Sequence, residues 1–277
     1  MLIKSFTIHN FLNYEYYTIK LDKISSINDI NILKSLYVFK YLVTLSEDHP
    51  ELASLVTNEK KPNDNEETIF KVEVDYKGDE YTYQINVFKN EIVFEELTWN
   101  KKTVYQRIKN EVILNNEPLV WNCHNSKYKP FLNTCATTDN QLAANFFFFL
   151  KENIEGIIPW INSALTDLTK KLFNEEEDVL VETIKNIGFY SNNNIIDLYY
   201  PMEMAELSSI TNINFDNIDS LKTRKFLKLN IFINWLRIVE GGVLLIDDLD
   251  MIEFLDYLKK YVTYLKNIQI IIKTKEV

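Results

Sequence analysis

The sequence predicts an α/β protein in which a mixed sheet carries an antiparallel β meander and a helical lobe is inserted into the core. First, an apolar run, Val243–Ile246, leads into paired carboxylates, as a buried parallel strand does at the functional edge of an α/β sheet. Second, alternating segments joined by tight turns between residues 69 and 97 are typical of an antiparallel sheet. Third, helical periodicity dominates after residue 140.

The composition is that of an ordinary globular protein, and it limits the possible partners. Of 277 residues, 46% are hydrophobic and 25% are charged, so the chain can bury a sizeable core. A net charge of −10 does not favour direct nucleic-acid binding, because phosphate-binding surfaces usually carry a basic excess. No apolar run reaches the roughly 18 residues that cross a bilayer, and Met1–Lys4 opens directly into a strand pattern rather than a signal segment. We expect a cytoplasmic protein with no membrane contact.

The amino-terminal third is predicted to begin with a hairpin and a helix. Leu2–Ile8 alternates apolar and polar residues, residues 9–13 form a turn, and Tyr14–Leu21 is the second strand. A short strand at Lys23–Ile27 follows, and the periodicity from about Ile32 to Leu45 predicts a helix.

The middle of the chain is predicted to be the meander. A polar loop at residues 60–67 precedes it. Its strands are Ile69–Tyr76, Tyr81–Phe88 and Glu91–Leu97, and Thr103–Leu114 continues it as one further segment.

The carboxy-terminal half is predicted to be mainly helical. Helices are expected at residues 141–154, 159–173, 175–186, 221–239 and 249–266, and strands at residues 195–200, 243–246 and 268–272. We expect a single head, residues 1–277, in which lobe I comprises about residues 1–120 and 218–277, and helical lobe II about residues 121–217.

Parts of this pattern resemble the ABC-class ATPases of the RecF, SMC and OLD type. The opening MLIKSFTIHNFL, Met1–Leu12, is similar to their first strand and the turn that follows it. The meander at residues 70–97 resembles the AAA-type ATPase-like proteins of bacterial abortive-infection systems, and Gly241–Asp248 resembles their Walker B element. The resemblance covers nearly the whole chain. It implies a P-loop-NTPase-like, ABC-type ATPase head that dimerises around nucleotide and works beside an effector nuclease or toxin.

The resemblance places the P-loop at residues 28–35, and the chemistry of that motif tests the assignment. Lys34 and Ser35 match its end, where they imply contacts to the nucleotide. Asn28 and Leu33 stand where both glycines belong, and no glycine precedes Gly78. Side chains there obstruct the phosphates or disfavour the backbone conformation. Asp29 adds a negative charge beside the phosphate position. A solvated helix start explains Lys34 and Ser35 more simply than a retained phosphate contact does.

The Walker B element is the best preserved. Asp247 matches the acid that holds Mg²⁺, and Asp248 takes the place of the catalytic glutamate with a side chain shorter by one methylene. Such a shortening displaces a base by roughly an ångström, which matters for positioning. A plain acidic strand end that includes Asp250 is the alternative.

The other two elements of the nucleotide site are altered. The ABC signature corresponds to residues 220–225, where Ser220, Thr223 and Arg224 remain but Lys222 replaces the glycine. No histidine follows the last strand, where the switch residue belongs and Thr274 stands. Changes in several elements of one nucleotide site indicate that hydrolysis has been lost. Phosphoryl transfer depends on the electrostatic stabilisation that all of these elements give to the phosphates.

We therefore predict a pseudo-ATPase that needs no nucleotide and acts as a scaffold or regulator in phage defence. It would be a homodimer or pair with an effector or an active ATPase. The first alternative is a genuine, slowly hydrolysing ATPase that binds ATP and Mg²⁺ through a non-standard phosphate loop. The second is a metal-dependent nuclease that uses Asp247, Asp248 and Asp250.

Overall fold

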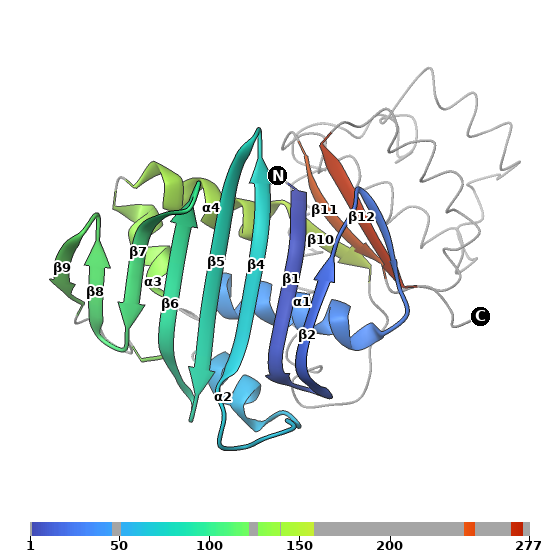
Figure 1. Cartoon of the computed structure of the whole chain (residues 1–277), viewed down its shortest axis with the longest axis horizontal. Helices are drawn as coiled ribbons and strands as arrows, with labels where there is room; N and C mark the ends of the chain where they lie inside the picture. Colours follow the sequence, from blue (N-terminus) through green and yellow to red (C-terminus); the bar gives the residue numbers. More distant parts are fainter. Residues whose placement is uncertain are drawn as a thin grey trace, which may run out of the picture.

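The structure is a computed structural model that describes residues 2–45, 51–121, 127–138, 140–157, 241–246 and 267–273. Within these ranges the strands form two separate sheets rather than one mixed sheet (Figure 1). One is an eight-stranded antiparallel sheet, and the other is a four-stranded parallel sheet. The α/β class is confirmed, but the expected single sheet is divided.

The antiparallel sheet has the order β2-β1-β4-β5-β6-β7-β8-β9. Its strands are β1 (Leu2–Phe11), β2 (Tyr14–Lys20), β4 (Thr68–Tyr76), β5 (Asp79–Phe88), β6 (Glu91–Trp99), β7 (Lys102–Ile108), β8 (Glu111–Leu114) and β9 (Glu117–Val120). The predicted hairpin and meander are confirmed. The predicted single segment Thr103–Leu114 is instead two strands, because the chain turns at Lys109 with a φ of 55°.

The parallel sheet has the order β10-β11-β12-β3. It contains β3 (Ile24–Ile27), β10 (Ile154–Ile157), β11 (Gly242–Ile246) and β12 (Ile268–Lys273). β11 is buried along its whole length, as expected for an apolar strand covered on both faces. β10 was not predicted. The helix expected at residues 141–154 ends at Glu152, and Ile154 already belongs to this sheet.

The helices are α1 (Ile30–Leu45), α2 (Glu51–Asn58), α3 (Phe131–Thr137) and α4 (Gln141–Glu152). α1 confirms the expected helix but starts two residues earlier than residue 32. The short helices α2 and α3 were not predicted. The predicted helices at residues 159–173, 175–186, 221–239 and 249–266, and the strand at 195–200, lie outside the described residues.

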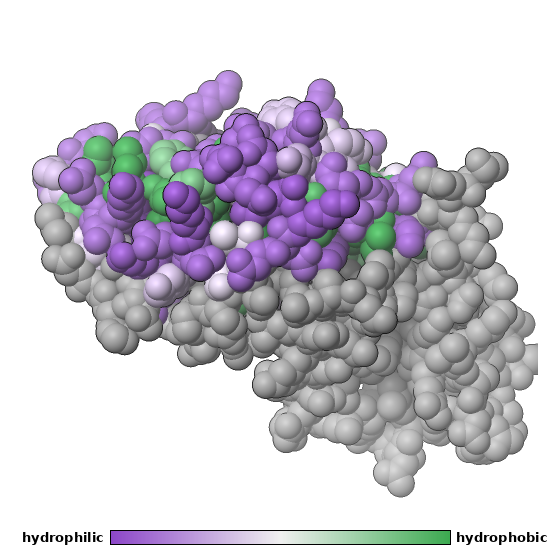
Figure 2. All heavy atoms as spheres, turned by 90° about the horizontal axis from the view of Figure 1, so that it is seen from below, coloured by the Kyte–Doolittle hydropathy of each residue, from purple (hydrophilic) through white to green (hydrophobic). Residues whose placement is uncertain are grey.

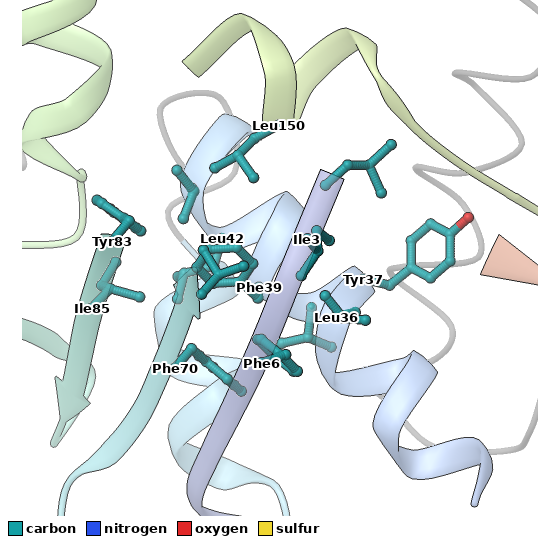
Figure 3. Close-up of a cluster of buried hydrophobic side chains, with 14 of the residues drawn as sticks. Ile3, Phe6, Leu36, Tyr37, Phe39, Leu42, Phe70, Tyr83, Ile85 and Leu150 are labelled. Carbon is teal, nitrogen blue, oxygen red and sulfur yellow. The ribbon is translucent and has the colours of Figure 1, made fainter. Parts of the chain in front are cut away.

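The main core lies between the helices and one face of the antiparallel sheet. Figure 1 shows α1, α3 and α4 on the same side of this sheet. Phe39 of α1 packs against Phe6 and Phe70, with ring centroids 5.8 and 6.2 Å away (Figure 3). All three rings are fully buried. The opposite face carries mainly polar residues, and from below the view of Figure 1 the described surface is mostly hydrophilic (Figure 2).

Tight hairpin turns in this glycine-poor chain use asparagine and lysine. Both turn residues have positive φ in four of the hairpins, as this turn type requires. The pairs are Lys77–Gly78, Lys89–Asn90, Asn100–Lys101 and Asn115–Asn116. Asparagine tolerates this conformation better than most residues, and the scarcity of glycine therefore does not prevent sharp turns.

One buried side chain, that of Gln269, forms hydrogen bonds between the two sheets. Gln269 of β12 accepts a hydrogen bond from the Ile3 amide and donates one to the Ile3 carbonyl, both at 2.8 Å. Its Nε2 also donates to the carbonyl of Asp22, at 2.9 Å. Ile3 stands where the pairing of β1 with β4 shifts register. The Gln269 amide thus takes the place of a neighbouring strand at this irregularity.

Replacement of Gln269 by leucine should lower the free energy of unfolding by about 3 kcal/mol, because it leaves the buried backbone N–H and C=O of Ile3 without their partner. Urea unfolding measures the change. Gln106→Leu is the control. Its amide donates to Glu96 on the partly exposed outer face, and its loss should cost under about 1 kcal/mol. Equal losses in the two variants would show that Gln269 does not join the sheets.

Candidate functional site

The candidate site lies at the edge of the parallel sheet where its strands end. The register places Ser26 of β3, Ile272 of β12 and Ile246 of β11 side by side. Since the strands are parallel, their carboxyl ends share one edge, which is where open α/β sheets bind ligands. The chain continues from β3 into α1 at this edge, and Asp247 follows β11 in the sequence.

The amino terminus of α1 is capped by the side chain of Asp29, the residue just before the helix. β3 ends at Ile27 and α1 begins at Ile30, so the connection consists only of Asn28 and Asp29. The Asp29 carboxylate accepts a hydrogen bond from the Asn31 amide at 2.8 Å, and the Asp29 carbonyl accepts one from the Ile32 amide at 3.2 Å. This is a helix cap that uses amides a bound phosphate would need.

The hairpin β1–β2 holds the cap in place. The Tyr14 hydroxyl donates a hydrogen bond to the second oxygen of Asp29. Burial and this bond raise the pKa of Tyr14 far above its usual value, so it remains a donor at neutral pH. The Asn31 side chain donates to Asn13 at 3.3 Å. The carboxylate is therefore fixed from both sides, by the helix and by the hairpin.

Lys34 and Ser35 lie in the second turn of α1 rather than at its first residues. The Lys34 ammonium is 3.8 Å from the Glu59 carboxylate, just after α2, and burial lowers its pKa. The Ser35 hydroxyl is buried and donates to the carbonyl of Asn31 at 2.6 Å. Both side chains thus have contacts within the fold, and their contact with nucleotide stays a prediction.

The remaining predicted site residues lie outside the described residues. They are Asp247 and Asp248 of the Walker B element and Ser220, Thr223 and Arg224 of the signature. Asp250 and Thr274 also lie outside. Within the described ranges, no group of three or more His, Cys, Asp or Glu side chains is arranged to hold a metal ion. Nor does any described helix combine the length and apolarity needed to cross a membrane.

The sequence pattern did not predict a buried polar cluster that surrounds Glu95. Glu95 of β6 is fully buried and lies at the centre of the cluster. Its carboxylate accepts hydrogen bonds from the hydroxyls of Tyr83 (3.0 Å) and Tyr105 (2.6 Å), the amides of Phe131 (2.6 Å) and Leu132 (2.8 Å), and the Arg107 guanidinium (3.4 Å). The alternation of β6 carried a signal, because Glu95 has the same phase as the buried Leu97.

The cluster attaches α3 to the sheet. Pro130 precedes α3 and provides no side-chain cap, so Glu95 caps the helix from a distant strand. Arg107 also donates to the carbonyl of Lys129 at 2.5 Å and lies 4.5 Å from the Trp121 ring centroid. Burial and the charge of Glu95 raise the pKa values of Tyr83 and Tyr105, so both remain donors. We read this cluster as structural, because its donors and acceptors are used within the fold.

Glu95→Gln should destabilise the chain by about 3–5 kcal/mol, since the Arg107 charge stays buried without its counter-charge. Urea unfolding at neutral pH measures the effect. Glu96→Gln is the matched control. Glu96 is the adjacent residue, partly exposed on the other face, and its substitution should change stability by under about 1 kcal/mol. A near-neutral Glu95→Gln would show that the cluster contributes little.

Comparison with solved structures finds weak similarity to several chains. The recombination mediator RecF with ATPrS, of the RecFOR pathway, has a TM-score of 0.41 and 10% identity over 100% of this chain and 93% of its own. The SMC head domain from Thermotoga maritima has a TM-score of 0.42 and 12% identity over 100% and 90%. RecF with ATP has a TM-score of 0.37 and 11% identity over 99% and 93%. No protein-family model and no curated protein matches the chain.

Proposed function

We propose that the chain is a catalytically degenerate ABC-type ATPase-like subunit. It acts as a scaffold or regulator in an antiphage defence complex, as a homodimer or beside an effector or an active ATPase. The observation that carries the loss of catalysis is the Asp29 carboxylate at the amino terminus of α1. The defence context is supported by the resemblance of residues 70–97 and 241–248.

The cap opposes phosphate binding through both geometry and charge. A helix start binds phosphate through free amides and its positive dipole end. Here the Asn31 amide is already hydrogen-bonded to a carboxylate. An incoming phosphate would also meet that negative charge. At about 4 Å, repulsion between like unit charges is about 1 kcal/mol in water and about 4 kcal/mol near a protein surface.

The length of the connection adds a second obstacle. A P-loop wraps phosphates with the backbone amides of an extended loop between strand and helix. In this chain residues 30–33 are already helical, and the connection from β3 consists of two residues. Asn28 is not among the residues with positive φ, so it does not substitute for a glycine of that loop. The strand and the helix that would flank such a loop are present, but only two residues connect them.

The role is tested with the chain expressed beside its neighbouring genes in cells exposed to phage. Deletion of the chain should abolish protection. The double variant Lys34→Ala, Asp247→Ala should retain it, because neither side chain would serve hydrolysis. Plaque counts measure protection, and matched expression of the variants is the control.

Two results would contradict this function. If deletion leaves protection unchanged, the defence role is wrong. If the purified chain hydrolyses ATP and the double variant does not, the chain is the genuine ATPase of the first alternative. Cleavage of DNA with Mn²⁺ that depends on Asp247 would instead indicate the nuclease.

A further inference from the structure

The edge strand β2 is exposed along most of its length. Glu15, Tyr16, Tyr17, Thr18 and Lys20 are all exposed, and Tyr16 retains 70% of its accessible surface. β2 pairs with β1 on one side and is the last strand of the antiparallel sheet. Figure 1 shows its other side facing away from that sheet.

The register shows which backbone groups point outward. The Leu21 amide donates to the Lys4 carbonyl at 2.8 Å, which makes this pair a hydrogen-bonded one. Hydrogen-bonded and non-hydrogen-bonded pairs alternate in antiparallel strands. The N–H and C=O groups of Tyr16, Thr18 and Lys20 therefore point away from β1. In agreement, the Thr7 and Thr18 hydroxyls are 2.8 Å apart, because the side chains of a backbone pair without hydrogen bonds lie close together.

Several usual protections of an edge strand are absent from β2 within the described part of the chain. Natural edges carry charged side chains, proline, a bulge or a cover that prevents pairing with another strand, and of these β2 has the charges of Glu15 and Lys20. The opposite edge, β9, contains Pro118. β2 contains no proline, its pairing with β1 has no register shift, and no other described strand pairs with it. Its outward backbone groups form a ready template for one more strand.

We propose that β2 pairs antiparallel with β2 of a second copy of this chain, around a twofold axis at Thr18. In this register Thr18 lies opposite Thr18 of the copy, and Tyr16 lies opposite Lys20. The first pair is a favourable threonine contact, and the second places an ammonium against an aromatic ring. On the other face Tyr17 lies opposite Ile19. No like charges are directly opposed.

Other registers fit less well. An axis at Lys20 would oppose two ammonium groups, which is unfavourable. An axis at Tyr17 would place Tyr16 opposite Thr18, so it would lack both the threonine pair and the contact of Lys20 with Tyr16. The complementarity within β2 thus favours a second copy over an unrelated strand. A strand pair is smaller than the roughly 1,200–2,000 Å² of a standard interface, so we expect a dimer that dissociates on dilution.

Sedimentation of the full chain between about 1 and 200 µM tests the proposal, with association expected at the upper end. Thr18→Pro should abolish association, because it removes the central outward N–H while leaving the bonds to β1 intact. Thr18→Ser is the matched control and should still associate. A monomer at every concentration, or a dimer insensitive to Thr18→Pro, overturns the proposal.

A cross-linking experiment tests the register. In a Cys123→Ser background, Thr18→Cys should form a disulfide-linked dimer on oxidation, because hydrogen-bonded neighbours lie about 5.5 Å apart at Cα. Glu15→Cys should not, since the two copies of residue 15 are far apart in this register. Efficient cross-linking through Glu15→Cys with none through Thr18→Cys overturns the register. The outcome is independent of nucleotide, so a failure here does not affect the proposed function.

Discussion

The contact of Gln269 with Ile3 is the constraint on which the arrangement of the two sheets depends. One amide side chain satisfies both backbone groups of Ile3 and the carbonyl of Asp22, which precedes β3. It therefore fixes the antiparallel sheet against the parallel sheet at the point where the chain passes from one to the other. This attachment helps to position α1, and with it the candidate site, because only two residues separate α1 from β3.

Two carboxylates in the described part of the chain serve the fold at helix amino termini. Asp29 caps α1 and is held by Tyr14, while Glu95 caps α3 and is held by two tyrosines and an arginine. In both cases an acid occupies a helix amino terminus, where the helix dipole and free amides favour negative charge. The amino terminus of α1, at which we propose that phosphate binding has been lost, is thus capped by a carboxylate of the chain itself.

The strands were predictable because their side chains alternate, as in the hairpin and the three strands of the meander. The hydrogen bonds of Gln269 were not predictable, because this residue interrupts an apolar run and its partner Ile3 is 266 residues away. The absence of glycine before Gly78 is a weaker argument against a P-loop than the sequence alone suggests. Lys89, Asn90 and Asn100 adopt positive φ here, so the absence of early glycines alone does not exclude a sharp loop. The Asp29 cap and the short connection provide the stronger argument, and only Asp29 was visible in the sequence.

The central claim is that the amino terminus of α1 is closed to phosphate. Titration of the purified chain with ATP and Mg²⁺ in a calorimeter tests this most directly. The account predicts no saturable heat up to about millimolar ATP, equivalent to binding weaker than about −4 kcal/mol. Micromolar, Mg²⁺-dependent binding that disappears in Lys34→Ala would contradict it, because a phosphate would then reach the helix start despite Asp29.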